Sequence, residues 1–185
     1  MKKKEQGVIY KTDLKEQIFV IEFSPYEWSK NIIAVGLQSK VVIASVTFPE
    51  EQEEDDDDET EEESENGDIE GFSFKVIKDF SCGTRVQCLA WGPDTSLKGL
   101  PQVISFAVAT ASHRITVNTS DLGSSHHSRY LEGHQNYVNS LAFDPEGSLL
   151  ASVSDDLTCQ LWNMRKAPAQ HKQKSKSDAT FWLNS

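Results

Sequence analysis

The stretch Leu131–Asn163, LEGHQNYVNSLAFDPEGSLLASVSDDLTCQLWN, decides the fold of this chain. It contains a His, several Ser, two adjacent Asp and a Trp. Apolar residues alternate in VNSLAF, SLLASVS and TCQLW, which is the period of a β-strand with one buried face. The polar residues therefore either form a Ser-His-Asp catalytic site or hold a unit of β-sheet together.

Two earlier segments repeat this pattern. IFVIEFSPY from Ile18, VQCLAWGPD from Val86 and VNSLAFDPE from Val138 align without gaps, with an aromatic residue sixth and Pro eighth. Each is followed by a second apolar strand (NIIAVG, VISFAVATAS, SLLASVSD) and a third (KVVIASVTF, RITVNTSD, TCQLWNM). No amphipathic helical pattern lies between them, so the sequence predicts a repeated antiparallel β-structure.

The third copy resembles a WD repeat. It has EGH at Glu132–His134, then a strand, then S-x-D-x-T-x-x-L-W, and it ends in Trp162-Asn163, where the family usually has Trp-Asp. The copies start 68 and 52 residues apart, and setting aside 49–71 and 95–101 leaves 45 in each interval. WD units repeat every 40–45 residues. The resemblance implies an all-β fold, a partial WD40 β-propeller of about three antiparallel four-stranded blades out of seven.

The resemblance also assigns a role to four polar residues. His134, Ser152, Asp156 and Trp162 are expected to form the structural tetrad of a blade, with Ser154 as an alternative to Ser152. Such a buried chain satisfies several polar groups at once and fixes a loop and a turn against the sheet. The matching positions of the other two copies hold other residue types: Leu14, Cys82 and Asn118.

A catalytic role for these residues is disfavoured by the sequence. No G-x-S-x-G elbow is present, and Ser152 and Ser154 lie within a strand-to-turn pattern. The three cysteines, Cys82, Cys88 and Cys159, lack the paired spacing of zinc ligands. We therefore expect no enzymatic activity, no cofactor and no metal, and we expect the thiols to be small apolar side chains in a reducing compartment.

The acidity of the chain is local. Thirteen carboxylates lie between Glu50 and Glu65, and without them the formal charge changes from −11 to +2. We expect the acidic insert 49–71 to be a disordered, solvated loop, in which Thr60 precedes three glutamates as a possible phosphorylation site. A near-neutral remainder without a basic patch or a run of ~20 apolar residues predicts no direct nucleic-acid binding and no membrane insertion.

The pattern divides the chain into three parts. Residues 1–17 are expected to be an N-terminal arm, 18–164 the partial propeller, and 165–185 a disordered tail outside the propeller. The third unit is then expected to lack its outer strand, and His126-His127 to lie in a Ser-rich loop. Three blades leave two blade faces open, so we expect the chain alone to be poorly stable or prone to aggregation unless a partner covers them.

The first two units, beginning IFVIEFSPYEWSKNIIAVGLQSK and RVQCLAWGPD, resemble the small WD-repeat nucleoporins of the outer-ring Y complex, from about Ile18 to Met164. The resemblance implies a scaffold at the nuclear pore, in the nuclear envelope, that supports pore assembly, protein and mRNA transport. It implies other nucleoporins as partners, especially a large α-solenoid nucleoporin, and an appearance at kinetochores in mitosis. The alternative is a generic WD40 adaptor, such as a ubiquitin-ligase substrate receptor or a chromatin-complex subunit.

Overall fold

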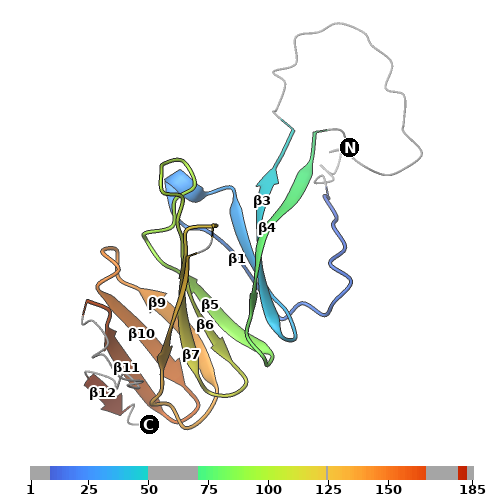
Figure 1. The fold of residues 1–185 in the computed structure, drawn as a ribbon. Helices are drawn as coiled ribbons and strands as arrows, with labels where there is room; N and C mark the ends of the chain where they lie inside the picture. The colour runs from blue at the N-terminus through green and yellow to red at the C-terminus, as the bar shows by residue number, and fades with distance from the viewer. Residues whose placement is uncertain (1–8, 50–70, 124, 166–178, 183–185) are drawn as a thin grey trace, which may run out of the picture.

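The chain forms three four-stranded antiparallel sheets that lie side by side (Figure 1). This computed structural model describes residues 9–49, 71–123, 125–165 and 179–182. The first blade contains β1 (Val20–Phe23), β2 (Ile32–Gly36), β3 (Lys40–Thr47) and β4 (Ser73–Ser81), with a short 3-10 helix, η1 (Glu27–Ser29), after β1. The second contains β5 (Val86–Trp91), β6 (Ile104–Thr110), β7 (Ile115–Ser120) and β8 (His126–Leu131). The third contains β9 (Val138–Phe143), β10 (Leu149–Ser154), β11 (Thr158–Asn163) and β12 (Ala179–Trp182).

Each blade is a meander of consecutive strands. The strand orders are β1-β2-β3-β4, β5-β6-β7-β8 and β12-β11-β10-β9, and every neighbouring pair is antiparallel. The first strands of the three units, β1, β5 and β9, contact one another in sequence. The expected partial β-propeller with antiparallel four-stranded blades is therefore confirmed.

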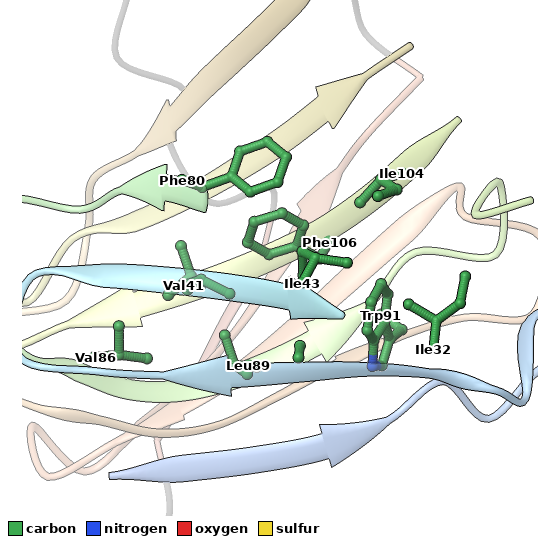
Figure 2. Packing of buried hydrophobic residues seen from close by; sticks show 11 residues of the cluster. Ile32, Val41, Ile43, Phe80, Val86, Leu89, Trp91, Ile104 and Phe106 are labelled. Carbon is green, nitrogen blue, oxygen red and sulfur yellow. The ribbon is translucent and has the colours of Figure 1, made fainter. Parts of the chain in front are cut away.

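The first two blades enclose an aliphatic and aromatic core (Figure 2). Phe80 of β4 packs edge-on against Phe106 of β6, with ring centroids 4.9 Å apart, and Trp91 packs against Phe106 with ring centroids 6.4 Å apart. The backbone of the first blade at Gly36 lies close to Val86 of the second blade, because a Cβ at this position would overlap the side chains of Val20 and Val86. The alternating residues of the repeats are thus the ones that meet between the blades.

The second and third blades share a core with smaller side chains. Ala107 and Ala109 of β6 lie in the same cluster as Leu150 of β10 and Trp162 of β11, and all four are at most 1% exposed. The small alanines leave room for the large indole. Trp162 therefore packs between two blades as well as donating a hydrogen bond within its own.

Hydrogen bonds also cross from the first blade to the second. The Tyr26 hydroxyl donates to the carbonyl of Trp91 at 3.1 Å, and the indole of Trp28 donates to the carbonyl of Thr95 at 2.8 Å. The Trp91 indole donates in return to the carbonyl of Glu22 at 3.2 Å. Trp28 is half-exposed and stacks on Tyr26, so it links the two blades while presenting part of its ring to solvent.

The N-terminal arm is associated with the far face of the first blade. That face holds a second buried apolar cluster, against which Leu14 packs: Ile33, Val35, Leu37, Val42, Ala44 and Val46. Tyr10 stacks on Phe72 with ring centroids 4.8 Å apart and meets Phe48 edge-on at 5.4 Å. Glu16 forms an ion pair with Lys40 at 2.9 Å. The arm therefore supplies apolar cover to a face that faces away from the second blade.

Two expectations about the outer strands are wrong. The third blade does have an outer strand, because β12 pairs antiparallel with β11 through residues that were assigned to a tail outside the propeller. The open edge of β11 offers unpaired backbone groups, and ATFW contains residue types that favour strands. His126 and His127 begin strand β8 instead of lying in a loop, and pair with Ser120 and Thr119 of β7.

Several predicted features lie outside the described residues. They are Thr60, residues 50–70 of the acidic insert, residues 1–8 of the arm, and residues 166–178 and 183–185 of the tail. Within the described ranges, no helix has the length and apolar character needed to cross a bilayer. Nor do the described side chains include a group of three or more His, Cys, Asp or Glu placed to hold a metal ion.

Candidate functional site

The four residues of the expected tetrad, called the quartet below, come from one connection between strands, one turn and two strands. His134 lies between β8 and β9, Ser152 in β10, Trp162 in β11, and Asp156 in the turn that joins β10 to β11. That turn is closed by a hydrogen bond from the Leu157 N–H to the Ser154 carbonyl at 3.1 Å. The antiparallel pairing of β10 with β11 brings Ser152 and Trp162 to the same side of the blade.

The structure brings all four side chains into one hydrogen-bonded chain. His134 Nδ1 lies 2.8 Å from Asp156 Oδ2, and His134 Nε2 lies 2.7 Å from Ser152 Oγ. The Trp162 indole N–H donates to the same Ser152 Oγ at 2.9 Å. A neutral imidazole with its proton on Nδ1 satisfies both of its bonds, donating to the carboxylate and accepting from the hydroxyl.

The two serines that the sequence left open have different partners. Ser152 bonds the histidine and the tryptophan, as above. Ser154 donates from its hydroxyl to the carbonyl of Asn136 at 3.3 Å and accepts the N–H of Asp156 at 3.1 Å. Ser152 therefore occupies the serine position of the quartet, and Ser154 shapes the turn that carries Asp156.

Asp156 has hydrogen-bond partners outside the quartet. Its carboxylate accepts the Thr158 hydroxyl at 2.6 Å, the Thr158 N–H at 3.0 Å and the Gln135 N–H at 2.9 Å. Burial by itself raises the pKa of Asp156, but the hydrogen bonds from Thr158, Gln135 and His134 outweigh it and lower the pKa to about 2. Thr158 was visible as the Thr of the S-x-D-x-T motif, whereas a backbone N–H leaves no mark in a sequence.

Gly133 lies close against the side chains beside the quartet. A Cβ at this position would overlap Oε1 of Gln160 and would lie 3.0 Å from the ring of Trp162. The Gln160 side chain is buried. Among the buried side-chain nitrogen and oxygen atoms of the described residues, its Oε1 is the single one without a hydrogen-bond partner. The small residue before His134 thus lets the connection approach the indole closely.

The order Ser152–His134–Asp156 has the hydrogen-bond pattern of a hydrolase triad, but the serine is not available for chemistry. Ser152 is 1% exposed, and its Oγ already accepts the indole N–H of Trp162. A nucleophile must reach a substrate carbonyl beside an oxyanion hole. The arrangement instead ties β10, β11, their turn and the preceding connection to one another.

The matching positions in the other blades make different contacts. Asn118 of β7 is buried and accepts the Ser128 hydroxyl of β8 at 2.8 Å. Cys82 lies against the core of the first two blades, and its burial raises the pKa of the thiol to about 11. Leu14 belongs to the arm. The first two blades are therefore held mainly by apolar packing.

Comparison with known proteins supports the assignment of the repeat. The family model "WD domain, G-beta repeat" matches residues 125–163, the segment that contains the quartet. A solved structure of Chaetomium thermophilum Sqt1, bound to the N-terminus of the ribosomal protein L10, covers 85% of this chain with a TM-score of 0.57. Its sequence identity is 18%, so this similarity shows the fold alone.

Closer relatives are similar over most of the chain. Nucleoporin Nup37 of Homo sapiens is 39% identical over 169 residues, which cover 90% of this chain and 48% of that protein. Nucleoporin Nup37 of Drosophila melanogaster is 31% identical over 153 residues, covering 80% of this chain and 42% of the relative. The chain thus spans about half the length of the curated relatives it matches.

Proposed function

We propose, from its similarity to nucleoporin Nup37, that this chain with its WD repeat at 125–163 is a structural scaffold component of the nuclear pore. The observation that carries the proposal is the 39% identity to the human nucleoporin over 90% of the chain. The fold alone would not distinguish a nucleoporin from another WD adaptor, because propellers serve many functions. The similarity extends well beyond the single motif-bearing repeat at 125–163.

The proposed role is non-catalytic. The quartet of His134, Ser152, Asp156 and Trp162 is the arrangement nearest to a catalytic site among those that the sequence suggested, and its serine is buried. We assign it to fixing the third blade as a rigid unit. A rigid blade presents its loops and rim in a fixed geometry, which is what a scaffold contributes to an assembly.

The partner class follows from the nucleoporin relationship. We propose that the chain docks on other nucleoporins, in particular a large α-solenoid nucleoporin of the outer-ring Y complex, at the nuclear envelope. In this role it supports pore assembly and nucleocytoplasmic transport. Association with kinetochores in mitosis remains a prediction of the same assignment.

Affinity purification tests the proposal. The tagged 185-residue chain, expressed in cells, is expected to co-purify with α-solenoid nucleoporins and to accumulate at the nuclear rim. A matched sample carrying Ser152→Ala tests whether an intact third blade is needed for that association. Enrichment of a cullin adaptor or of histones, without nucleoporins, would instead support a generic WD40 adaptor and would refute the nuclear-pore role.

A further inference from the structure

A hollow lies where connections of the first two blades meet the segment that precedes the third blade. Its volume is about 640 Å³. The residues that line it come from the segment before β1, from the connections β2–β3, β4–β5 and β6–β7, and from the segment before β9: Gln17, Phe19, Gln38, Ser39, Gly83, Thr84, Arg85, Ala111 and Tyr137. Ligand sites in proteins span roughly 300–1,000 Å³, so the hollow is large enough for a short peptide segment.

Arg85 is the only charged side chain in this lining. Its guanidinium donates to the neutral Oε1 of Gln87 at 3.0 Å and lies 5.3 Å from the centre of the Phe19 ring. No carboxylate of the described residues lies within ion-pair distance of Arg85. The hollow therefore contains a cation whose charge is not neutralised by a neighbouring side chain of the described residues.

The remaining lining is neutral and polar. Gln17 and Gln38 carry amides, and Ser39, Thr84 and Tyr137 carry hydroxyls, so the walls offer both donors and acceptors around the guanidinium. A main-chain segment presents alternating N–H and C=O groups, which amides and hydroxyls can satisfy. An ionised carboxylate fits the planar fork of the arginine and forms the stronger, charge-assisted hydrogen bond.

The backbone around the hollow is held by bonds between blades and connections. The Gly83 N–H donates to the Ser39 carbonyl at 3.1 Å, and the Ala111 N–H donates to the Arg85 carbonyl at 2.8 Å. The Tyr137 ring is braced by an edge-on contact with His113, at 5.0 Å between ring centres. A rim fixed in this way loses little conformational freedom when a ligand is bound.

We propose that this hollow binds an acidic segment of a partner protein, with a carboxylate on Arg85 and the adjoining main chain on the amides and hydroxyls. Nucleic acid fits less well, because its binding depends on several cations that contact successive phosphates, and the hollow has one. The site is separate from the buried quartet. The proposal does not rest on the role of the chain at the nuclear pore.

The test measures binding of a fluorescein-labelled hexaglutamate peptide to the 185-residue chain by fluorescence anisotropy. Saturable binding is expected, and Arg85→Gln should weaken it about tenfold, the effect of losing a charge-assisted hydrogen bond. The matched control is Arg114→Gln, which removes an arginine that stacks on Tyr130 outside the hollow. That variant should bind the peptide within about twofold of the unchanged chain.

A second pair of variants leaves Arg85 in place, so the result does not depend on how the first variant folds. Thr84→Glu places a carboxylate at the exposed rim beside the guanidinium and should abolish binding, because it repels the acidic peptide and occupies Arg85. Thr84→Gln introduces a side chain of nearly the same shape as Glu without the charge, and it should retain binding. The proposal is overturned if the unchanged chain does not bind hexaglutamate, or if Thr84→Glu and Thr84→Gln bind equally. Comparable binding of hexalysine or of a single-stranded oligonucleotide would overturn it as well.

Discussion

At the scale of single residues, Ser152 joins the two halves of the quartet because its hydroxyl contacts both His134 and Trp162. We expect Ser152→Ala to lower the free energy of unfolding by about 2 to 3 kcal/mol, since it leaves a buried ring nitrogen and a buried indole N–H without a partner. Ser140, an exposed serine of β9, provides the control, and Ser140→Ala should change stability by less than about 0.5 kcal/mol. Urea unfolding followed by tryptophan fluorescence measures both; equal effects would contradict a role for the quartet in stability.

Asp156 makes stability depend on pH. Its pKa falls from an ordinary value of 3.8 to about 2 in the folded chain, so the unfolded state binds the proton more readily. The stabilisation is therefore complete above about pH 4 and is lost as the pH falls from about 4 towards 2. Thermal unfolding between pH 7 and pH 2 should show this loss in the unchanged chain and less of it in Asp156→Asn. The neighbouring Asp155→Asn should retain the full dependence.

The residues of the quartet could be predicted from the sequence, and some of their partners could not. Motif spacing identified His134, Asp156 and Trp162, but it left Ser152 and Ser154 open. The strand register decides between them, because Leu150 lies opposite Trp162 of β11, and Ser152 is two residues from Leu150 whereas Ser154 is four residues from it. The Gln135 N–H that bonds Asp156 is a backbone group, and every residue except proline has one.

At the scale of elements, β12 protects the open edge of β11. Deleting residues 179–185 should expose that edge, and we expect faster hydrogen exchange at amides of β11 (Thr158–Asn163) that face β12, with more aggregation. Deleting only 183–185 keeps the strand and serves as the control. Unchanged exchange in β11 after the longer deletion would show that the pairing contributes little protection.

The N-terminal arm acts as a cover for the first blade. Leu14→Ala should lower the free energy of unfolding by about 1 kcal/mol by removing apolar contact with the cluster on the far face. It should also increase the fluorescence of a hydrophobic dye such as ANS, because that cluster becomes more accessible. Lys11 is exposed in the same arm, and Lys11→Ala should leave both readings unchanged.

The central strands of each blade were predictable, whereas the outer strands were not. The strands β2 and β6 contain dense apolar residues, because both of their faces are covered. β8 reads HHSRYL, and most of its side chains are exposed, so no apolar alternation marks it. β12 follows a long polar segment and forms a strand by pairing with the edge of β11. This is a tertiary interaction, which the local sequence pattern does not predict.

At the scale of the whole molecule, the far face of the first blade is covered only in part. Ile21 and Phe23 of β1 and Val76 of β4 are 57%, 51% and 49% exposed, and each pairs opposite a residue of the buried far-face cluster. We expect the purified chain to associate as its concentration rises, since such a patch buries apolar area against another molecule. Sedimentation velocity should show this, and Ile21→Ser with Phe23→Ser should reduce it. A monodisperse monomer at all concentrations would contradict the expectation.

The number and order of the blades followed from the repeat, but the contacts between them did not. Trp28 stood outside the strand alternation, and its hydrogen bond to the carbonyl of Thr95 joins residues far apart in the sequence. The packing of Leu14 on the far face likewise depends on the position of the arm in the folded chain. Periodicity predicts which face of a strand is buried, and it does not specify the neighbour that buries it.

The meander within each blade bears on how the chain folds while it is being synthesised. Within a blade, every strand after the first pairs with the one before it, so the first blade has all its strands once Ser81 has left the ribosome, before the third blade has been translated. The quartet can close only after the first two blades have been translated, because Trp162 belongs to the third unit. A nascent chain would therefore have a formed first sheet while the quartet residues of the third blade were still in the exit tunnel.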